Sequence, residues 1–186
     1  MRLEIGLTAA FERWAHRAGF QITEASSTDG RAIVWDGGGE IRYFLGVDAD
    51  GWIVATCSER MGREQFELAS TLPSLIERKF IADFARPIRP PLSGLPALAH
   101  PRTAEDVAAG YSIGRQHFFW GKDRCTLVDP EGRVVAVVGG GELVDTMKVV
   151  YLSVLASNTV EAIEQSFLDP EASQCSLFGM TRVEKR

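Results

Sequence analysis

The sequence predicts an α+β fold, in which one domain packs helices in a layer against antiparallel strands. Apolar residues recur at helical spacing in some segments and alternate with polar residues in others. The alternating segments form two runs, with helical segments before, between and after them. Turns of a few residues join the first run, and parallel neighbours would need longer crossovers. That run is therefore predicted to be an antiparallel meander.

The composition fits one globular domain. The chain has 186 residues, of which 45% are hydrophobic and 24% charged. This length supports a sizeable core, and no apolar run approaches the roughly 20 residues that a membrane-spanning helix needs. We expect residues 1–178 to form the domain and residues 179–186 a flexible tail.

The first predicted helix covers residues 7–18, where Thr8 could cap its start and Gly19 is expected to end it. The period then changes to two. The first run of strands is predicted at residues 20–24, 31–35, 41–47, 52–57 and 64–68.

A central helix is predicted over residues 72–84. Pro87, Pro90 and Pro91 are expected to end it and to leave residues 86–102 as a long connection. Thr103 and Asp106 indicate a short helical turn. Further strands (110–119, 124–128, 134–138) and two further helices follow, at 143–155 and at 158–167, the last capped by Asn158 with Glu161.

Acidic residues concentrate in two stretches of a chain whose formal charge is −5. Residues 20–50 carry six acidic and two basic side chains, and residues 142–171 carry six and one. This pattern argues against nucleic-acid binding and suits a basic protein partner. Asp36, Glu40, Glu161 and Glu164 are the candidate partner-binding carboxylates. The alternative is a solvated surface that only aids solubility.

Three adjacent aromatic residues, Phe118 to Trp120, lie on a predicted strand. Successive side chains of a strand face opposite sides, so Phe118 or Trp120 points outward unless both faces are covered. An exposed aromatic residue is a typical interface anchor, which makes Trp120 a candidate partner-binding residue.

The most enzyme-like segment is residues 134–143, a strand, three glycines and the start of a helix. This layout can bind phosphate through backbone N–H groups. However, the segment lacks the Lys-Ser/Thr end of a P-loop, and Glu142 would repel an anion. A plain strand-to-helix turn is the favoured interpretation, and we expect no catalytic residue and no cofactor.

The histidines and cysteines form no recognisable site. His16, His100 and His117 lack a second ligand at metal-binding spacing, so no metal is expected. Cys57, Cys125 and Cys175 are an odd number with wide spacing, as for reduced thiols in a cytoplasmic protein.

A series of short motifs occurs between residues 51 and 178: Gly51-Trp52, Ser58-Glu-Arg60, Glu64-Gln-Phe66, Ile76-Glu-Arg78, Ile88-Arg89, Leu95-Pro-x-Leu98, Gly110-Tyr111, Asp129-x-x-Gly132, Phe167-Leu-Asp-Pro170 and Leu177-Phe178. Arg60 and Arg78 belong to these motifs, although both could pair within the chain with Glu64 or Glu77. Together the motifs resemble one family of bacterial polymorphic-toxin immunity proteins, which includes the immunity factor (antitoxin) of the tuberculosis necrotizing toxin.

The resemblance implies a cytoplasmic, non-catalytic protein that blocks the active site of a secreted toxin in a 1:1 complex. In this family the named toxin hydrolyses NAD, so the resemblance implies an NAD glycohydrolase as partner, with no membrane and no small-molecule substrate. The alternatives are an acidic secretion chaperone or adaptor, and a small enzyme that uses the glycine segment.

Overall fold

The structure is a computed structural model that describes residues 5–93 and 103–168. This part of the chain contains eight strands in a single antiparallel sheet with the order β1-β2-β3-β4-β5-β8-β7-β6. The strands are β1 Phe20–Thr23, β2 Ala32–Asp36, β3 Ile41–Val47, β4 Ile53–Glu59, β5 Gln65–Ser70, β6 Ser112–Phe118, β7 Lys122–Val128 and β8 Val134–Val138.

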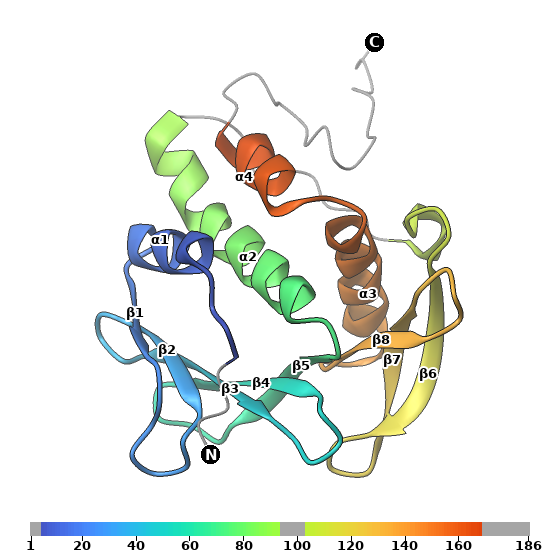
Figure 1. The fold of residues 1–186 in the computed structure, drawn as a ribbon, viewed down its shortest axis with the longest axis horizontal. Coiled ribbons are helices and arrows are strands. Elements are labelled where there is room, and N and C mark those ends of the chain that lie inside the picture. Colours follow the sequence, from blue (N-terminus) through green and yellow to red (C-terminus); the bar gives the residue numbers. More distant parts are fainter. Residues whose placement is uncertain (1–4, 94–102, 169–186) are drawn as a thin grey trace.

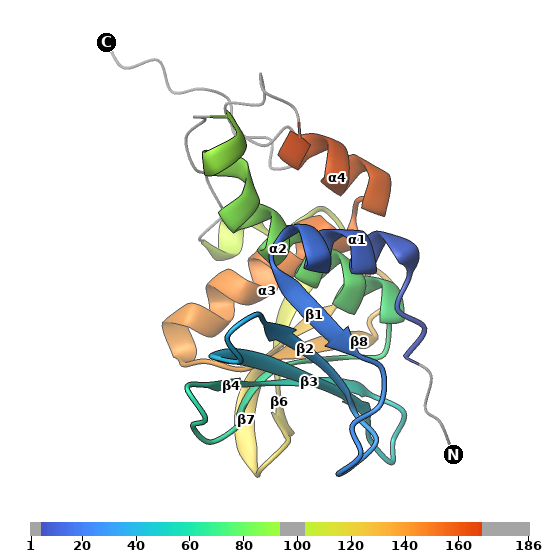
Figure 2. The ribbon, with the colours of Figure 1, turned by 90° about the vertical axis from the view of Figure 1, so that its left-hand side faces the viewer.

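Four α-helices in the described residues cover one face of the sheet, which makes a two-layer α+β domain (Figures 1 and 2). The predicted fold class and order of elements are confirmed. The helices are α1 Ala9–Arg17, α2 Pro73–Ser93, α3 Glu142–Ala156 and α4 Val160–Leu168, with one short 3₁₀ turn at Ala104–Asp106.

Helix α1 follows the capping logic of its sequence. The Thr8 side-chain oxygen accepts the backbone N–H of Phe11 at 3.3 Å, which satisfies a donor at the helix start. At the other end Gly19 has φ +83°, a conformation that glycine adopts without steric cost. Both signals therefore fix the helix where the apolar spacing predicts it.

The meander β1 to β5 is antiparallel throughout, as predicted. The second run, β6 to β8, joins it through β5 and β8, with Leu68 opposite Val138. This junction makes one continuous sheet from two runs that are separated in sequence by α2. The helices can therefore pack on one shared core.

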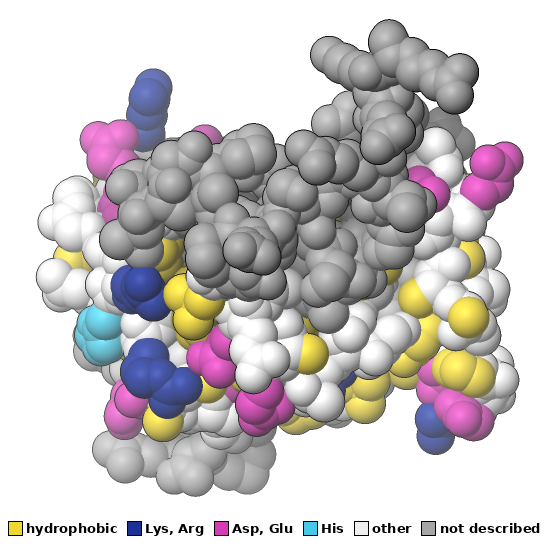
Figure 3. Space-filling model, turned by 90° about the horizontal axis from the view of Figure 1, so that it is seen from above, with side chains coloured by type: hydrophobic (Ala, Val, Ile, Leu, Met, Phe, Trp, Pro, Cys, Tyr) yellow, Lys and Arg dark blue, Asp and Glu magenta, His cyan; other side chains and the backbone are white. Residues whose placement is uncertain are grey.

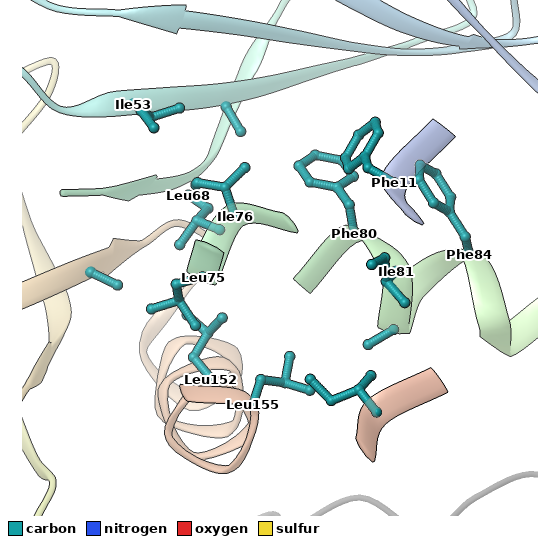
Figure 4. Close-up of a cluster of buried hydrophobic side chains, with 14 of the residues drawn as sticks. Phe11, Ile53, Leu68, Leu75, Ile76, Phe80, Ile81, Phe84, Leu152 and Leu155 are labelled. Atoms are coloured by element: carbon teal, nitrogen blue, oxygen red, sulfur yellow. The ribbon is translucent and has the colours of Figure 1, made fainter. Parts of the chain in front are cut away.

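The core lies between the sheet and the helices. Phe11 of α1 meets Phe80 and Phe84 of α2 at ring-centroid distances of 5.8 and 5.6 Å in edge-to-face geometry. Leu68 of the sheet and Leu155 of α3 are also buried in this layer (Figure 4). Each such side chain contributes about 1.5–3 kcal/mol when fully buried.

Helix α2 does not end before its prolines, so that prediction was wrong. The helix runs through Pro87, Pro90 and Pro91 to Ser93. An interior proline removes a backbone hydrogen bond at a cost of about 3 kcal/mol. Packing offsets this cost, since Ala85 and Ile88 continue the buried face of the helix. Residues 94–102 of the expected connection lie outside the described residues.

Among the smaller predicted features, one is confirmed and another is wrong. The turn at Thr103 is confirmed, with the Thr103 N–H and hydroxyl both 3.0 Å from the Asp106 carboxylate. The cap of α4 was misplaced by one residue, because Thr159 accepts the N–H of Ala162 at 3.2 Å. The expected tail lies beyond the described residues. Among the described helices, none has the length and apolar character to cross a membrane.

Candidate functional site

The face of the sheet opposite the helices, here the open face, carries no described helix (Figures 1 and 2). Aromatic side chains gather on this face. Because strand side chains alternate, β4 sends one set toward the helices and the other onto this face. The open face has its own small cluster, in which Val54, Phe66, Ala69 and Val137 are buried under Trp52, Phe118, Phe119 and Val134.

The β6–β7 hairpin provides the cover for this cluster. It curves away from the helices and beneath the sheet, so that its tip contacts strands from the first run (Figure 2). The rings of Phe118 and Trp52 lie 5.1 Å apart, and those of Phe119 and Phe66 lie 5.3 Å apart. The Arg124 guanidinium stacks on the Phe66 ring at 4.2 Å. These contacts hold the hairpin tip against the open face.

Trp120 lies at the tip of this hairpin and is 57% exposed. The structure therefore exposes one of the two aromatic residues singled out in the sequence and leaves Phe118 half-buried. Phe119 and Trp120 both have left-handed backbone, with φ of 36° and 59°. Bulky residues rarely adopt this conformation, and it costs about 1–3 kcal/mol per residue. The turn thus presents a large aromatic side chain to solvent at a cost in stability.

A rigid ion pair lies on the same face. Arg31 donates from Nη1 to Glu64 Oε2 at 2.7 Å and from Nη2 to Oε1 at 2.8 Å, while the Thr56 hydroxyl donates to Oε2 at 2.6 Å. The Arg31 hydrogen bonds lower the pKa of Glu64, and the same bonds raise the pKa of Arg31. The Arg31 stem crosses β3 where Gly46 stands, since a Cβ there would lie 2.9 Å from Arg31 Cγ.

A groove of about 330 Å³ lies beside the ion pair and the hairpin tip, since residues of both line it. Phe119 and Trp120 contribute aromatic side chains to the lining, and Asp29, Arg31 and Asp48 contribute charged ones. Residues of β3, β4 and the segment before β5 also line it, through Gly46, Val54, Thr56 and Glu64. The groove thus combines an exposed indole with several carboxylates on one surface.

Asp36 and Glu40 lie together in the β2–β3 hairpin. Asp36 serves the turn itself, since its Oδ1 accepts the N–H of Ile41 at 3.1 Å. Glu40 is exposed and pairs with Arg60 of the β4–β5 hairpin at 3.4 Å. Arg60 and Met61 both have left-handed backbone and are largely exposed. Glu40 is therefore the more available of the two carboxylates.

Glu161 and Glu164 lie on α4, in the helical layer and away from Trp120. Glu164 accepts the Trp14 indole N–H at 2.7 Å and an Arg13 N–H at 3.2 Å, so it holds α4 against α1. Glu161 is exposed, and hydrogen bonds at the helix start lower its pKa. The five candidate residues therefore occupy three separate places: one hairpin, one helix and the tip of another hairpin.

Figure 3 looks onto the helical side of the molecule. Acidic and basic side chains lie next to one another at several places on this side, rather than forming a single acidic field. Long-range steering depends on summed charge, so neighbouring opposite charges weaken it. Steering by the acidic stretches remains a prediction, and the exposed carboxylates Glu40 and Glu161 are its best-placed carriers.

The glycine segment before α3 has a structural explanation. A Cβ at Gly139 would lie 2.2 Å from the Phe66 carbonyl oxygen, so only glycine allows β8 to pass this close to β5. The Gly141 N–H donates to Asp145 Oδ1 at 3.1 Å, and Lys148 Nζ donates to the Gly139 carbonyl at 2.7 Å. Asp145 therefore supplies the negative charge that a phosphate would bring to this helix start.

A buried charge cluster on the helical side was missed by the sequence analysis. A bulge in β5 leaves Glu67 without a partner in β4, because Leu68 and Phe66 pair with consecutive β4 residues. The bulge directs Glu67 toward the helices. There it accepts from Lys79 at 3.1 Å and from Lys148 at 2.9 Å. No local pattern announces a bulge, so the sequence gives no signal for this cluster.

The charged groups of this cluster stabilise one another's ionised forms. Burial alone would lower the pKa of Lys79, but Asp83 at 2.8 Å and Glu67 more than offset it and raise that pKa. Burial likewise opposes ionisation of Glu67, and the two ammonium groups lower its pKa. The cluster therefore fastens α2 and α3 to the sheet as a charged, internally paired unit.

Metal ligation has no support within the described ranges 5–93 and 103–168, where no group of three or more His, Cys, Asp or Glu residues could hold a metal ion. His117 pairs with Asp123 across the β6–β7 hairpin at 3.1 Å. Cys57 is half-buried and Cys125 is buried, while Cys175 and His100 lie outside the described residues. The described geometry thus consists of a groove and docking surfaces on a layered scaffold.

An α+β scaffold with an uncovered aromatic sheet face is typical of a protein-binding module. The chain belongs to the family described as Immunity protein 61, whose model matches residues 14–173. The resemblance stated from the sequence motifs is therefore confirmed at the level of the family.

Curated relatives agree with this assignment. The chain is 38% identical over 172 residues to the immunity factor for TNT of Mycobacterium tuberculosis (strain ATCC 25618 / H37Rv), covering 92% of this chain and 93% of that protein. The identity and coverage are the same for the immunity factor for TNT homolog of Mycobacterium bovis (strain BCG / Pasteur 1173P2). The solved structure of Rv3902c from M. tuberculosis matches with a TM-score of 0.81 and 35% identity, covering 92% and 94% of the two chains.

Proposed function

We propose that this protein is an antitoxin that binds the folded catalytic domain of a cognate secreted toxin and blocks its active site. Membership of the immunity protein family over residues 14–173 carries this proposal. The relatives named immunity factor for TNT support it, since they align with nearly the whole chain. The protein itself performs no reaction in this proposal, and it acts in the cytoplasm of the cell that it protects.

The open face is the surface that we assign to the toxin. Tight inhibition needs a buried interface of about 1,200–2,000 Å² with a few anchors at its centre, and Trp, Tyr and Arg are the commonest anchors. The open face supplies an exposed Trp120 next to a packed aromatic cluster and the Arg31–Glu64 pair. The helical side carries the core of the fold instead.

The chemistry of the toxin follows from the family resemblance. We propose that it is an NAD glycohydrolase and that one immunity protein binds one toxin domain. Blocking an active site requires shape and affinity rather than reactive groups. In agreement with this, charged side chains of this protein pair with one another, as Arg31 does with Glu64 and Lys79 with Glu67. No nucleic acid or membrane takes part.

Co-expression tests the proposal. The toxin catalytic domain encoded beside this gene should stop growth and deplete cellular NAD when produced alone. With this protein present, growth and NAD should both recover, and the two proteins should elute together as a 1:1 complex. Continued killing with soluble antitoxin present would refute the antitoxin function. Recovery of growth by a toxin that never consumed NAD would refute only the assigned chemistry.

The same experiment separates the proposal from a secretion chaperone. A chaperone would be dimeric and would bind an extended, unfolded segment of its client. The antitoxin should bind the folded domain and should ignore the same domain in an unfolded, reduced form.

A further inference from the structure

The groove on the open face combines one aromatic side with an excess of carboxylates. We propose that it receives a lysine or arginine side chain of the toxin, with the cation against Trp120 and the carboxylates of Asp29 and Asp48. This inference rests on the proposed function and adds to it the place and the chemistry of one anchor. The toxin should therefore carry a lysine or arginine at the position that faces the groove.

Charge complementarity carries the inference first. Three carboxylates line the groove, Asp29, Asp48 and Glu64, against the single guanidinium of Arg31. The lining therefore has a formal charge of −2, from three carboxylates and one guanidinium. A basic side chain gains from this field, whereas an acidic side chain would be repelled.

Arg31 does not neutralise all three carboxylates of the groove, because its single positive charge is already shared between Glu64 and Asp29. Its guanidinium gives two hydrogen bonds to Glu64, and its Nε donates to Asp29 at 2.7 Å. It also stacks on the Phe44 ring at 4.7 Å, which fixes its plane. Arg31 thus acts as a fixed part of the wall and cannot turn toward an incoming ligand without losing these contacts.

The carboxylates are held in place before any partner arrives. Asp48 Oδ1 accepts the backbone N–H groups of Asp50 at 3.0 Å and Trp52 at 2.8 Å, which fixes the β3–β4 turn. Asp29 Oδ1 accepts the Arg31 N–H at 3.1 Å. Pre-positioned acceptors lower the ordering cost of binding, so this side of the groove is suited to recognition.

The aromatic side supplies the second observation. Trp120 is 57% exposed and its ring lies against that of Phe119, with centroids 4.9 Å apart and an angle of 40° between the ring planes. Phe119 in turn is packed on Phe66, so the indole stands on a supported base. Tryptophan is the best partner for a cation over an aromatic ring, at about 0.5–2 kcal/mol. The left-handed backbone of this turn holds the indole out.

The size of the groove restricts its occupant. About 330 Å³ is at the lower end of the roughly 300–1,000 Å³ of small-molecule pockets, and it lies open on one face. This space suits one long side chain extending from a partner surface. A lysine or arginine can lay its apolar stem along Val54 and the rings while its charged end meets the carboxylates.

Binding of the toxin catalytic domain to three test variants and two control variants tests the inference. Trp120→Ala should weaken binding by at least about 30-fold, with Trp120→Phe recovering part of the loss. Asp29→Asn combined with Asp48→Asn keeps the turn acceptors and removes two charges. It should weaken binding about tenfold and flatten its dependence on salt. The matched controls are Asp50→Asn, an exposed carboxylate of the same turn, and Val144→Ala, an exposed apolar residue of α3.

The outcomes are separable. Wild-type protein that fails to bind the folded toxin domain refutes the proposed function and this inference with it. Wild-type binding with Trp120→Ala and the double asparagine variant both within threefold of it refutes the inference alone. A shift from dimer to monomer on Trp120→Ala, with toxin binding unchanged, would assign the groove to a second copy of the chain and would also refute it. Thermal unfolding of each variant checks that the fold is intact.

Discussion

Arg31 and Glu64 form a two-pronged ion pair across the open face, with N–O distances of 2.7 and 2.8 Å, although 33 residues separate them in sequence. Arg31 precedes β2 and Glu64 precedes β5, so the pair ties the β1–β2 loop to the far side of β3 and β4. The guanidinium lies on the Phe44 ring as it crosses. This ion pair thus holds two lining residues of the groove in place.

Glu64→Gln should destabilise the protein by about 1 kcal/mol at pH 7, because both side chains are partly solvated. The pKa of Glu64 is lowered in the folded protein. Its stabilisation is therefore present above the unfolded pKa of about 4.3 and is lost as the pH falls through the folded pKa. Urea unfolding should show a smaller difference between the variant and wild type at pH 3 than at pH 7. Equal losses for Glu59→Gln, an exposed residue in the same turn, would contradict this account.

Glu67→Gln should cost more, about 3 kcal/mol, since it leaves two ammonium groups of the buried cluster short of a partner. The lowered pKa of Glu67 places its contribution above the unfolded pKa, and the contribution disappears as the pH falls. The raised pKa of Lys79 matters at alkaline pH. The stabilisation by Lys79 is present below its unfolded pKa of about 10 and is lost as the pH rises through the folded pKa.

The pH dependence of unfolding distinguishes the cluster from a simple packing defect. Wild type should lose stability at both acidic and strongly alkaline pH, while Glu67→Gln should lack the part of the acidic loss that Glu67 causes. Glu105→Gln, an exposed residue of the 3₁₀ turn, should match wild type at every pH. A parallel offset of the Glu67→Gln curve over the whole range would refute the electrostatic explanation.

Gly139→Ala should destabilise the fold by about 1–3 kcal/mol or prevent folding, because its Cβ would meet the Phe66 carbonyl oxygen and ring. Gly141→Ala is the matched control in the same segment, since its Cβ would meet nothing within 4 Å. Chemical unfolding measures both variants. Added ATP or NAD should leave the melting temperature of wild type unchanged, and a rise with either ligand would revive the phosphate-binding interpretation.

Cys57 should react slowly in the folded protein. Burial, with smaller contributions from Glu67 and Glu59, raises the pKa of this thiol to about 11. At pH 8 its thiolate fraction is then about 0.1%, against roughly a quarter for an ordinary thiol. In a background with Cys125→Ala and Cys175→Ser, the reaction with an aromatic disulfide reagent should be at least about 100-fold slower in the folded than in the unfolded protein. A difference below tenfold would show that the thiol is accessible and ionised.

Local sequence patterns predict the elements of this fold well, because each depends on its own spacing and punctuation. The strands Ile41–Val47 and Val134–Val138 have the predicted bounds, and α1 begins after Thr8 as expected. For the three aromatic residues before Gly121, the sequence left open whether both faces are covered or whether Phe118 or Trp120 faces solvent. Trp120 does so from a turn rather than from a strand, since β6 ends at Phe118.

Long-range features could not be read in the same way. The pairing of β5 with β8 joins two runs that α2 separates, and no local signal names the partner strand. Arg78 illustrates the same point, because the sequence offered it Glu64 or Glu77 as partners. The structure instead places its guanidinium 2.9 Å from the Ala156 carbonyl, at the end of α3. The groove likewise combines residues from loops that meet only in the folded sheet.

The continuation of α2 through three prolines shows how packing overrides a strong local rule. Proline removes a donor and disfavours the helix, so the sequence pattern ends at Phe84. Ile88 nevertheless lies in the core at 8% exposure, and the helix must extend that far to bury it. Tertiary burial therefore outweighs a preference that is correct for an isolated segment.

Charge reversal at the two exposed carboxylates tests whether the acidic stretches steer a basic toxin. Glu40→Lys, alone and together with Asp36→Lys, and Glu161→Lys should each slow association with the toxin domain several-fold at low salt, with less effect at 0.5 M salt. Dissociation rates should change little, because rim charges act mainly on encounter. Stopped-flow fluorescence measures both rates.

Glu164→Lys needs separate treatment, because this carboxylate accepts the Trp14 indole N–H and bridges α1 to α4. Its reversal should lower the free energy of unfolding by about 1–3 kcal/mol whatever the partner does. Glu161→Lys, on the same helix, leaves that bridge intact. Its effect on the association rate therefore reports steering alone. If association is equally fast for wild type, Glu40→Lys and Glu161→Lys at low salt, these two carboxylates do not steer the toxin and belong to a solvated surface.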